Sequence, residues 1–272
     1  PEGTPAFCGQ DAQYPGNTRT FSETTVTAET YVSDSLTGLD WQQAYTASLD
    51  WYSAGNHCST LSYAGFTDWR LPDFYELTGL IDWSTIEPAI DTAFAGTPNE
   101  YFWSATSGND GTEAVRVRFD YGGAYLDPKT YSLNVRCVRG DSFFESMAAR
   151  FLLDETTTDE VVVVDQATGL NWQQLHEPNQ SWQEALEFCE GLGYGGHSAW
   201  RLPTVNELRS LLNHANATTL SDFPGMAPLD FWTSTTFVYS GSYADYVGFG
   251  NGYISNAPKA NNSNVRCVHD AW

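Results

Sequence analysis

Basic residues are scarce in this sequence of 272 residues. Lysine and arginine together number 12 against 34 aspartates and glutamates, so the formal net charge is −22, and two of the basic residues are lysines, Lys129 and Lys259. Proteins that bind a nucleic acid duplex place many cations against its phosphates. We therefore expect no nucleic acid partner, and sulfated polyanions and anionic membranes are poor partners for the same reason.

Long apolar segments are also missing. The strongest apolar run, 161–164, is far shorter than the roughly 20 residues that span a bilayer, so we expect no membrane insertion. With 41% hydrophobic, 15% aromatic and only 17% charged residues, the composition excludes a disordered chain. The sequence predicts a folded, acidic protein long enough for two domains. It starts at Pro1, as a processed or trimmed chain does, so a signal peptide would not be visible.

Signatures of common catalytic and metal sites are absent from the sequence. There is no Gly-x-Ser-x-Gly, His-Glu-x-x-His or phosphate-binding loop, and the five histidines show no metal-ligand spacing. Charged residues recur at Arg70 and Glu76 and again at Arg201 and Glu207. Each Glu stands at a helix-capping position, so we expect these pairs to be structural and the protein not to be an enzyme.

What the sequence does contain is an internal repeat. Residues 34–43 return as 165–174 with seven of ten positions identical, and Trp-Arg-Leu-Pro at 69–72 returns at 200–203, both at an offset of 131. Val-Arg-Cys-Val at 135–138 returns at an offset of 130. A nearly constant offset over this length indicates one domain type used twice. We predict domains at 19–139 and 150–272, a leader at 1–18 and a linker at 140–149.

Local patterns indicate an α+β domain. The β-branched stretches 25–32 and 160–164 predict an early strand in each copy. Two helices are expected to follow, one before and one after Trp-Arg-Leu-Pro, and Gly-, Tyr- and Asn-rich tails favour short strands and loops. Capping boxes open these helices at 181–184, 73–76 and 204–207.

The first helix of copy one lacks such a capping box. It opens with Asp50 and contains Ser53 and Gly55, residues that weaken helix interiors. We therefore expect this helix to be shorter or looser than its counterpart in copy two.

Five cysteines indicate the compartment. Cys58 and Cys137 are 79 residues apart in the first copy, and Cys189 and Cys267 are 78 apart in the second. The economical interpretation is one disulfide in each domain, which requires an oxidising compartment. Two pairs of reduced core cysteines are the alternative, while a zinc site lacks the ligand spacing. Cys8 is left over, either free or paired with another chain.

Both tails contain side chains suited to ligand binding. Tyrosine and asparagine among small residues are typical of adaptable binding surfaces, and carboxylates supply the oxygens that calcium takes. The ligand-binding candidates are Tyr121, Tyr125, Asp127, Tyr239, Tyr243, Tyr253 and Asn256. The calcium candidates are Asp110, Glu113, Asp120 and Asp245. The alternative is a solvated loop whose aromatic rings are half buried.

The order of the landmarks resembles one known family. Asp-x-x-Thr-Gly-Leu-x-Trp-Gln, a Trp-led helix with Cys, Trp-Arg-Leu-Pro-x-x-x-Glu-Leu, Phe-Trp and Val-Arg-Cys-Val are similar to the domain named for the C-terminal region of the Legionella collagen-like adhesin. The resemblance implies two tandem C-type-lectin-like domains, each with two helices, a small antiparallel sheet and a long loop region. It also implies a disulfide from the helix to the final strand, which agrees with the pairing above.

The resemblance implies an exported bacterial protein of the extracellular space or cell surface. The adhesin that names the family binds sulfated polysaccharides, but a net charge of −22 argues against that ligand here, and no collagen-like Gly-x-y tract is present. The leading hypothesis is a non-enzymatic adhesion protein that binds a glycan or a protein surface with calcium as its cofactor. The alternative is a subunit that assembles with copies of itself into a filament or surface layer.

A more remote hypothesis is an enzyme of the formylglycine-generating type, which shares a related fold. That chemistry uses reactive cysteines, and the pairing above assigns four of the five to disulfides. Fold alone carries no activity, so we do not expect this one.

Overall fold

The computed structural model describes residues 19–141, 150–157, 160–214, 216 and 219–270. The chain divides into two compact units, with the boundary between residues 143 and 144. We call them the first and the second domain. The predicted leader at 1–18, with Cys8, lies outside the described residues, as do residues 142–149 of the predicted linker.

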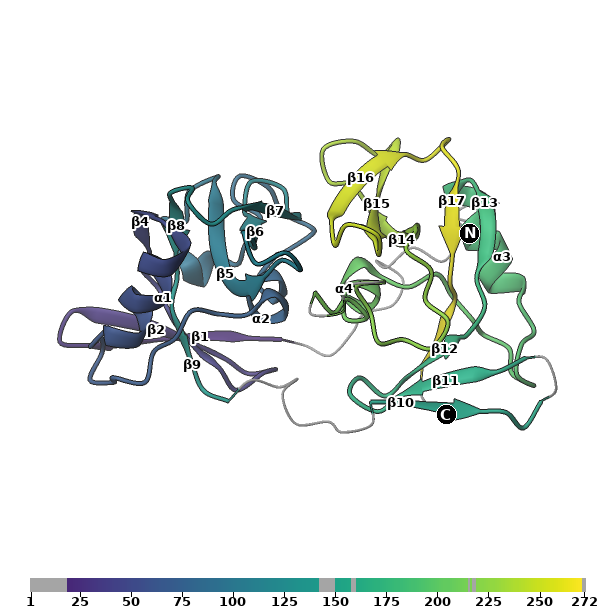
Figure 1. The fold of residues 1–272 in the computed structure, drawn as a ribbon, viewed down its shortest axis with the longest axis horizontal. Coiled ribbons are helices and arrows are strands. Elements are labelled where there is room, and N and C mark those ends of the chain that lie inside the picture. The colour runs from purple at the N-terminus through teal and green to yellow at the C-terminus, as the bar shows by residue number, and fades with distance from the viewer. Residues whose placement is uncertain (1–18, 142–149, 158–159, 215, 217–218, 271–272) are drawn as a thin grey trace, which may run out of the picture. The chain divides into compact units, whose positions relative to one another are not determined.

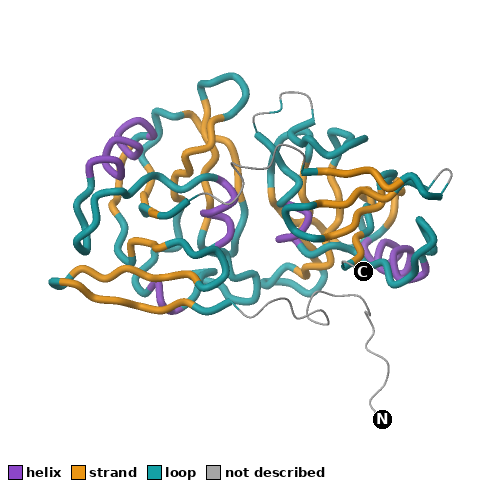
Figure 2. Tube along the Cα trace, turned by 90° about the horizontal axis from the view of Figure 1, so that it is seen from below, coloured by secondary structure: helices purple, strands orange, loops and turns teal. Residues whose placement is uncertain are grey.

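The first domain combines two sheets with two short helices (Figures 1 and 2). One sheet has the order β1-β2-β3-β9 and the other the order β4-β8-β5-β6-β7, in which β5 and β8 are parallel and the remaining neighbours antiparallel. Its elements are β1 (Phe21–Val26), β2 (Glu29–Asp34), β3 (Asp40–Gln42), β4 (Thr46–Leu49), α1 (Trp51–Thr60), α2 (Phe74–Gly79), the 3-10 turn η2 (Thr92–Phe94), β5 (Tyr101–Ser107), β6 (Glu113–Arg118), β7 (Ala124–Pro128), β8 (Leu133–Val135) and β9 (Val138–Arg139).

The second domain repeats this arrangement. Its sheets have the orders β10-β11-β12-β18 and β13-β17-β14-β15-β16. The elements are β10 (Phe151–Asp154), β11 (Val162–Asp165), β12 (Leu170–Gln173), β13 (Glu177–Gln180), α3 (Trp182–Gly191), α4 (Val205–Arg209), β14 (Asp230–Thr236), β15 (Tyr243–Gly248), β16 (Ile254–Pro258), β17 (Ser263–Val265) and β18 (Val268–His269). The predicted tandem of α+β domains is confirmed, while the C-type-lectin-like topology stays a prediction.

The early strand expected at 25–32 is wrong, because this stretch is a hairpin. β1 ends at Val26, β2 begins at Glu29, and the two strands pair antiparallel. Thr27 and Ala28 between them have φ angles of 49° and 70°. Two consecutive residues with positive φ are typical of a type I′ turn, whose central residues are usually Asn or Gly. Thr27 and Ala28 are not typical turn residues, so the sequence predicted one continuous strand where there are two.

Helix α1 is as long as α3, ten residues each, so the expectation of a shorter first helix is wrong. The carboxylate of Asp50 accepts a hydrogen bond from the backbone N–H of Ser53 and so caps the helix without a capping box. Ala54 and Cys58 of this helix are fully buried. Packing of that face outweighs the weak propensity of Ser53 and Gly55, as tertiary contacts commonly do.

The predicted capping boxes are all present. In α3 the hydroxyl of Ser181 accepts from the backbone N–H of Glu184, whose carboxylate accepts from the backbone N–H of Ser181. The same reciprocal pair joins Asp73 to Glu76 in α2 and Thr204 to Glu207 in α4.

Replacing the capping hydroxyl will weaken the second domain measurably. Ser181→Ala leaves a backbone N–H of the first turn of α3 without its side-chain partner, and such a change costs about 1 kcal/mol. Urea denaturation will show the loss as a lower midpoint at unchanged slope. Ser181→Asp keeps a capping oxygen and is the matched control. Equal midpoints for Ser181→Ala and Ser181→Asp would contradict the assigned role.

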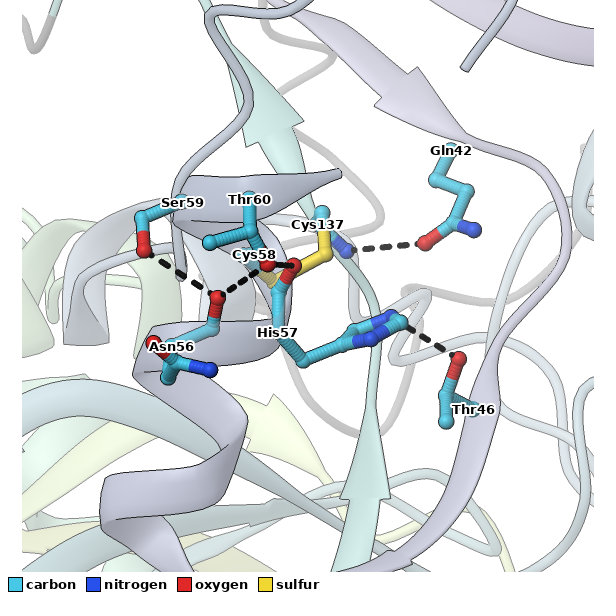
Figure 3. The surroundings of a disulfide bond; sticks show 8 residues. All are labelled: Gln42, Thr46, Asn56, His57, Cys58, Ser59, Thr60 and Cys137. Atoms are coloured by element: carbon cyan, nitrogen blue, oxygen red, sulfur yellow. Dashed lines mark hydrogen bonds between the residues drawn. A yellow bond between two sulfur atoms is a disulfide. The ribbon is translucent and has the colours of Figure 1, made fainter. Parts of the chain in front are cut away.

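Each domain core is built around a disulfide between the first helix and the segment before the last strand. Cys58 bonds Cys137 and Cys189 bonds Cys267, each pair with a Cα–Cα distance of 5.5 Å. The pairing predicted from the repeat is thus confirmed. In Figure 3 the backbone N–H of Cys137 donates to the side-chain oxygen of Gln42 at 3.4 Å, so the bridge is also tied to β3.

The Asp-x-x-Thr-Gly-Leu repeat forms a turn around a buried carboxylate. The side chain of Asp34 is fully buried, and it accepts hydrogen bonds from Arg19 Nε at 2.9 Å, from the backbone N–H of Leu36 at 3.0 Å and from the hydroxyl of Thr37. The pair Arg150 and Asp165 repeats the arrangement in the second domain. In the first domain this ion pair links the chain just before β1 to the turn that follows β2. In the second domain it links the chain just before β10 to the turn that follows β11.

Candidate ligand-binding face

One face of the β5-β6-β7 sheet in the first domain gathers arginine and tyrosine side chains. Arg116 lies opposite Trp103 on β5 and opposite Tyr125 on β7, and Arg118 lies opposite Tyr101. Residues that are direct cross-strand partners, or two apart on one strand, point to the same side of a sheet. We call this surface the arginine–tyrosine face. Its members are Tyr101, Arg116, Arg118, Asp120, Tyr121, Tyr125 and Asp127.

The two guanidinium groups stack against the tyrosine rings. Arg116 lies 3.7 Å from the ring centroid of Tyr101 and 5.8 Å from that of Tyr125. Arg118 lies 5.2 Å from the ring of Tyr101 and 4.1 Å from the ring of Tyr121. These distances fall within the range of cation–π attraction. The interleaved arginine and tyrosine side chains therefore contact one another across the three strands.

Two carboxylates balance the charge of this face. Arg116 Nε and Asp127 Oδ2 are 2.8 Å apart, and Arg118 forms an ion pair with Asp120. Burial acts to lower the pKa of Arg118, but the Asp120 carboxylate outweighs it and the pKa is raised. Burial raises the pKa of Asp127 in spite of the neighbouring Arg116. With two arginines and two aspartates, the face carries no net charge at neutral pH.

The hydroxyl of Tyr121 belongs to the same network. It accepts a hydrogen bond from Arg118 Nη1 at 2.6 Å, and burial raises the pKa of this phenol. Tyr121 stands in the turn between β6 and β7, so the turn is fixed to the face by its own side chain.

The equivalent face of the second domain has different side chains. Matching the strand registers places Tyr246 where the first domain has Arg116, and Gly248 where it has Arg118. The same match puts Asp230 in place of Tyr101 and Ala257 in place of Asp127. The fold is shared and the face is not, so the second domain forms this fold without these side chains.

The predicted candidates of the second domain fall in separate places. Tyr239 and Tyr243 lie around Phe237 in the β14–β15 turn, with ring centroids 5.7 and 6.4 Å from it, and are 45% and 36% exposed. Tyr253 stands before β16, with its backbone N–H bonded to Asn251. Asn256 is on β16, opposite Asp245. The structure therefore unites the candidates of the first domain but not those of the second.

The four calcium candidates are not brought together. Asp110 caps its own turn by accepting from the N–H and hydroxyl of Thr112, Asp120 is paired with Arg118, and Glu113 begins β6. Asp245 belongs to the second domain, where it is buried. Within the described parts of the chain, no group of three or more His, Cys, Asp or Glu side chains could hold a metal ion. Calcium binding stays a prediction.

The sequence pointed to four members of the face, Tyr121, Tyr125 and Asp127 as ligand-binding candidates and Asp120 as a calcium candidate, but not to the arginines at its centre. A signal for them exists in Glu-Ala-Val-Arg-Val-Arg at 113–118, where the alternation of a strand puts Arg116 and Arg118 on one side. Tyr101 joins the face only because β5 pairs with β6, and no local sequence pattern predicts that pairing.

Together these features define a class of protein, a tandem of α+β domains with one disulfide in each. The Lcl C-terminal domain family matches residues 30–139 and 161–269. The chain belongs to this family, and each of its domains is one copy. A comparison with curated proteins gave no match. Among the described residues, no helix is both long and apolar enough to cross a membrane.

Proposed function

We propose that this protein is an extracellular attachment protein that binds an uncharged glycan through the arginine–tyrosine face of its first domain. The family is named for an adhesin, which is compatible with attachment at a cell surface. The observation that carries the proposal is the face itself, a cluster of aromatic rings and charged groups. The second domain has the same fold but lacks this cluster.

The chemistry of the face suits a sugar. Tyrosine rings offer flat apolar area for the C–H faces of a pyranose, while guanidinium and carboxylate groups bond its hydroxyls. Arg116 and Asp127 retain 21% and 15% side-chain exposure, so both reach the surface. Because the side chains already hold one another, little conformational freedom is lost on binding. The zero net charge of the face and the −22 of the chain disfavour sulfated glycans.

A binding role without catalysis agrees with the placement of the recurrent carboxylates. Glu76 accepts two hydrogen bonds from Arg70, at 2.6 and 2.7 Å, while it also caps α2. Glu207 is held in the same way by Arg201 and the cap of α4. Each carboxylate therefore serves the fold. The four cysteines in disulfides are likewise unsuited to the cysteine chemistry of formylglycine-generating enzymes.

Removing tyrosine rings from the face will weaken attachment. We expect wild-type protein to bind neutral glycans on an array, and the double variant Tyr121→Ala with Tyr125→Ala to lose at least tenfold in affinity, since stacking on each ring is lost. The matched control is Tyr239→Ala with Tyr243→Ala, which removes two exposed rings of the second domain and leaves binding unchanged.

Two other outcomes would contradict the proposal. Loss of binding in the control variant alone would place the site in the second domain, and binding of sulfated glycans alone would overturn the charge argument. Running the array with calcium and again with a chelator tests the cofactor prediction separately. Light scattering under the same two conditions tests self-assembly, because a filament subunit would grow into large particles.

A further inference from the structure

Each domain encloses a fully buried arginine that donates hydrogen bonds to neutral acceptors among the described residues. Arg136 and Arg266 occupy the same place in the Val-Arg-Cys-Val repeat, and both are fully buried. Arg136 donates to the carbonyl of Gln43 at 3.1 Å and to the hydroxyl of Thr97 at 2.8 Å. Arg266 donates to the carbonyls of Gln173 and Gln174. Neither arginine takes part in an ion pair among the described residues.

Several N–H groups at these two places have no acceptor in the described structure. They are Nε and Nη1 of Arg136 and Nε and Nη2 of Arg266. The indole N–H groups of Trp41 and Trp172, which hold equivalent positions in the repeat and are fully buried, also lack an acceptor. Trp172 and Arg266 both contact Phe223, at 6.4 Å between ring centroids and at 4.4 Å from Cζ to the ring. In both domains the tryptophan also lies opposite the valine that stands two residues after the arginine, Trp41 opposite Val138 and Trp172 opposite Val268, so the indole and the guanidinium start from adjacent positions of paired segments.

The charge at both sites persists at neutral pH. Burial lowers the pKa of Arg136 and of Arg266 to about 9, which still leaves the guanidinium protonated at pH 7. Phenylalanine rings compensate part of the charge. Arg136 lies 4.9 Å from the ring of Phe94 and 5.5 Å from that of Phe102. An uncompensated charge in a protein interior is nevertheless costly, and buried ions are found paired.

We propose that each domain binds a small monovalent anion of the halide class, chloride in ordinary solution, between the buried guanidinium and the adjacent indole N–H. One such anion balances one guanidinium and accepts several N–H donors at once. Ordered water would satisfy the donors but not the charge, and it is the competing outcome. The same residues repeat in both domains although the binding faces have diverged, so the anion belongs to the shared fold.

Bromide scattering tests the inference on the unmodified protein. Crystals of the full chain grown in bromide are expected to show one anomalous peak beside Arg136 and one beside Arg266. Peaks confined to the surface, with water at both guanidinium groups, would overturn the proposal.

Stability in solution gives a second readout. At constant ionic strength and pH, replacing gluconate by chloride is expected to raise the melting temperature saturably, by on the order of 5 °C when chloride exceeds its dissociation constant tenfold. Arg136→Met and Arg266→Met each remove the response of one domain, and Trp41→Phe weakens that of the first. The matched control, Arg139→Met, breaks the surface ion pairs with Asp40 and Asp68 and keeps the full response. A response identical in all variants would refute the assignment.

Discussion

Replacing Cys58 and Cys137 together by alanine will lower the free energy of unfolding of the first domain by about 4.5 kcal/mol. The bridge closes a loop of 79 residues, and the stabilisation expected from restricting so long a loop in the unfolded chain is of that size. Domains of this length are stable by only about 5–15 kcal/mol, so the variant loses a large share of the stability of its first domain. Calorimetry will show the loss as a separate transition at lower temperature.

The second domain supplies the control for this experiment. Cys189→Ala with Cys267→Ala opens a loop of 78 residues and is expected to destabilise the second domain by the same amount while sparing the first. Non-reducing peptide mapping of the wild type must find both pairs. A different pairing, or a melt unaffected by either double variant, would contradict the assigned architecture.

Asp34→Asn is the second change with a large expected effect. It leaves the Arg19 guanidinium without its fully buried counter-charge, and breaking such a pair costs about 3 kcal/mol. Asn retains the shape of Asp, so the loss reflects the charge rather than packing. Urea denaturation at pH 7 measures the difference, with Asp141→Asn, an exposed position, as the control expected to change nothing.

The same carboxylate makes stability depend on pH. Burial of Asp34 acts to raise its pKa, but hydrogen bonds from Arg19, Thr37 and Leu36 outweigh it, so the pKa is lowered from its ordinary 3.8. A lowered folded pKa contributes stability that is present above pH 3.8 and is lost as pH falls through the folded value. The gap between wild type and Asp34→Asn therefore closes on acidification. A gap that stayed constant from pH 7 to pH 2 would exclude the ion pair as its cause.

Much of the fold could be predicted because its signals are local or duplicated. Capping boxes such as Ser181 with Glu184 specify a helix start within four residues, and the two equivalent cysteine pairs made one economical disulfide pattern. The hairpin at Thr27 and Ala28 was missed because the residue types that mark its turn are absent. The length of α1 was misjudged because burial of Cys58 and its neighbours, not propensity, decides it.

The candidate site was predicted only in part, for a physical reason. Tyr121 and Tyr125 could be proposed from composition, since they stand out among small polar residues. Their position beside Arg116 and Tyr101 depends on three strands that pair in register. Burial of Arg136 without a counter-charge is likewise a property of the assembled core, to which no motif points.

The disulfide of the first domain also decides how that domain would carry mechanical load. Tension applied at residues 19 and 139 passes from Cys58 to Cys137 directly through the sulfur–sulfur bond. The chain between the two cysteines, which includes the whole arginine–tyrosine face, lies outside this covalent path. At about 3.4 Å per extended residue, the loop closed by the bridge would be about 270 Å long if it were extended, and the bridge prevents that extension. Pulling on the domain would thus extend the segments outside the bridge first and keep a closed covalent ring around the arginine–tyrosine face.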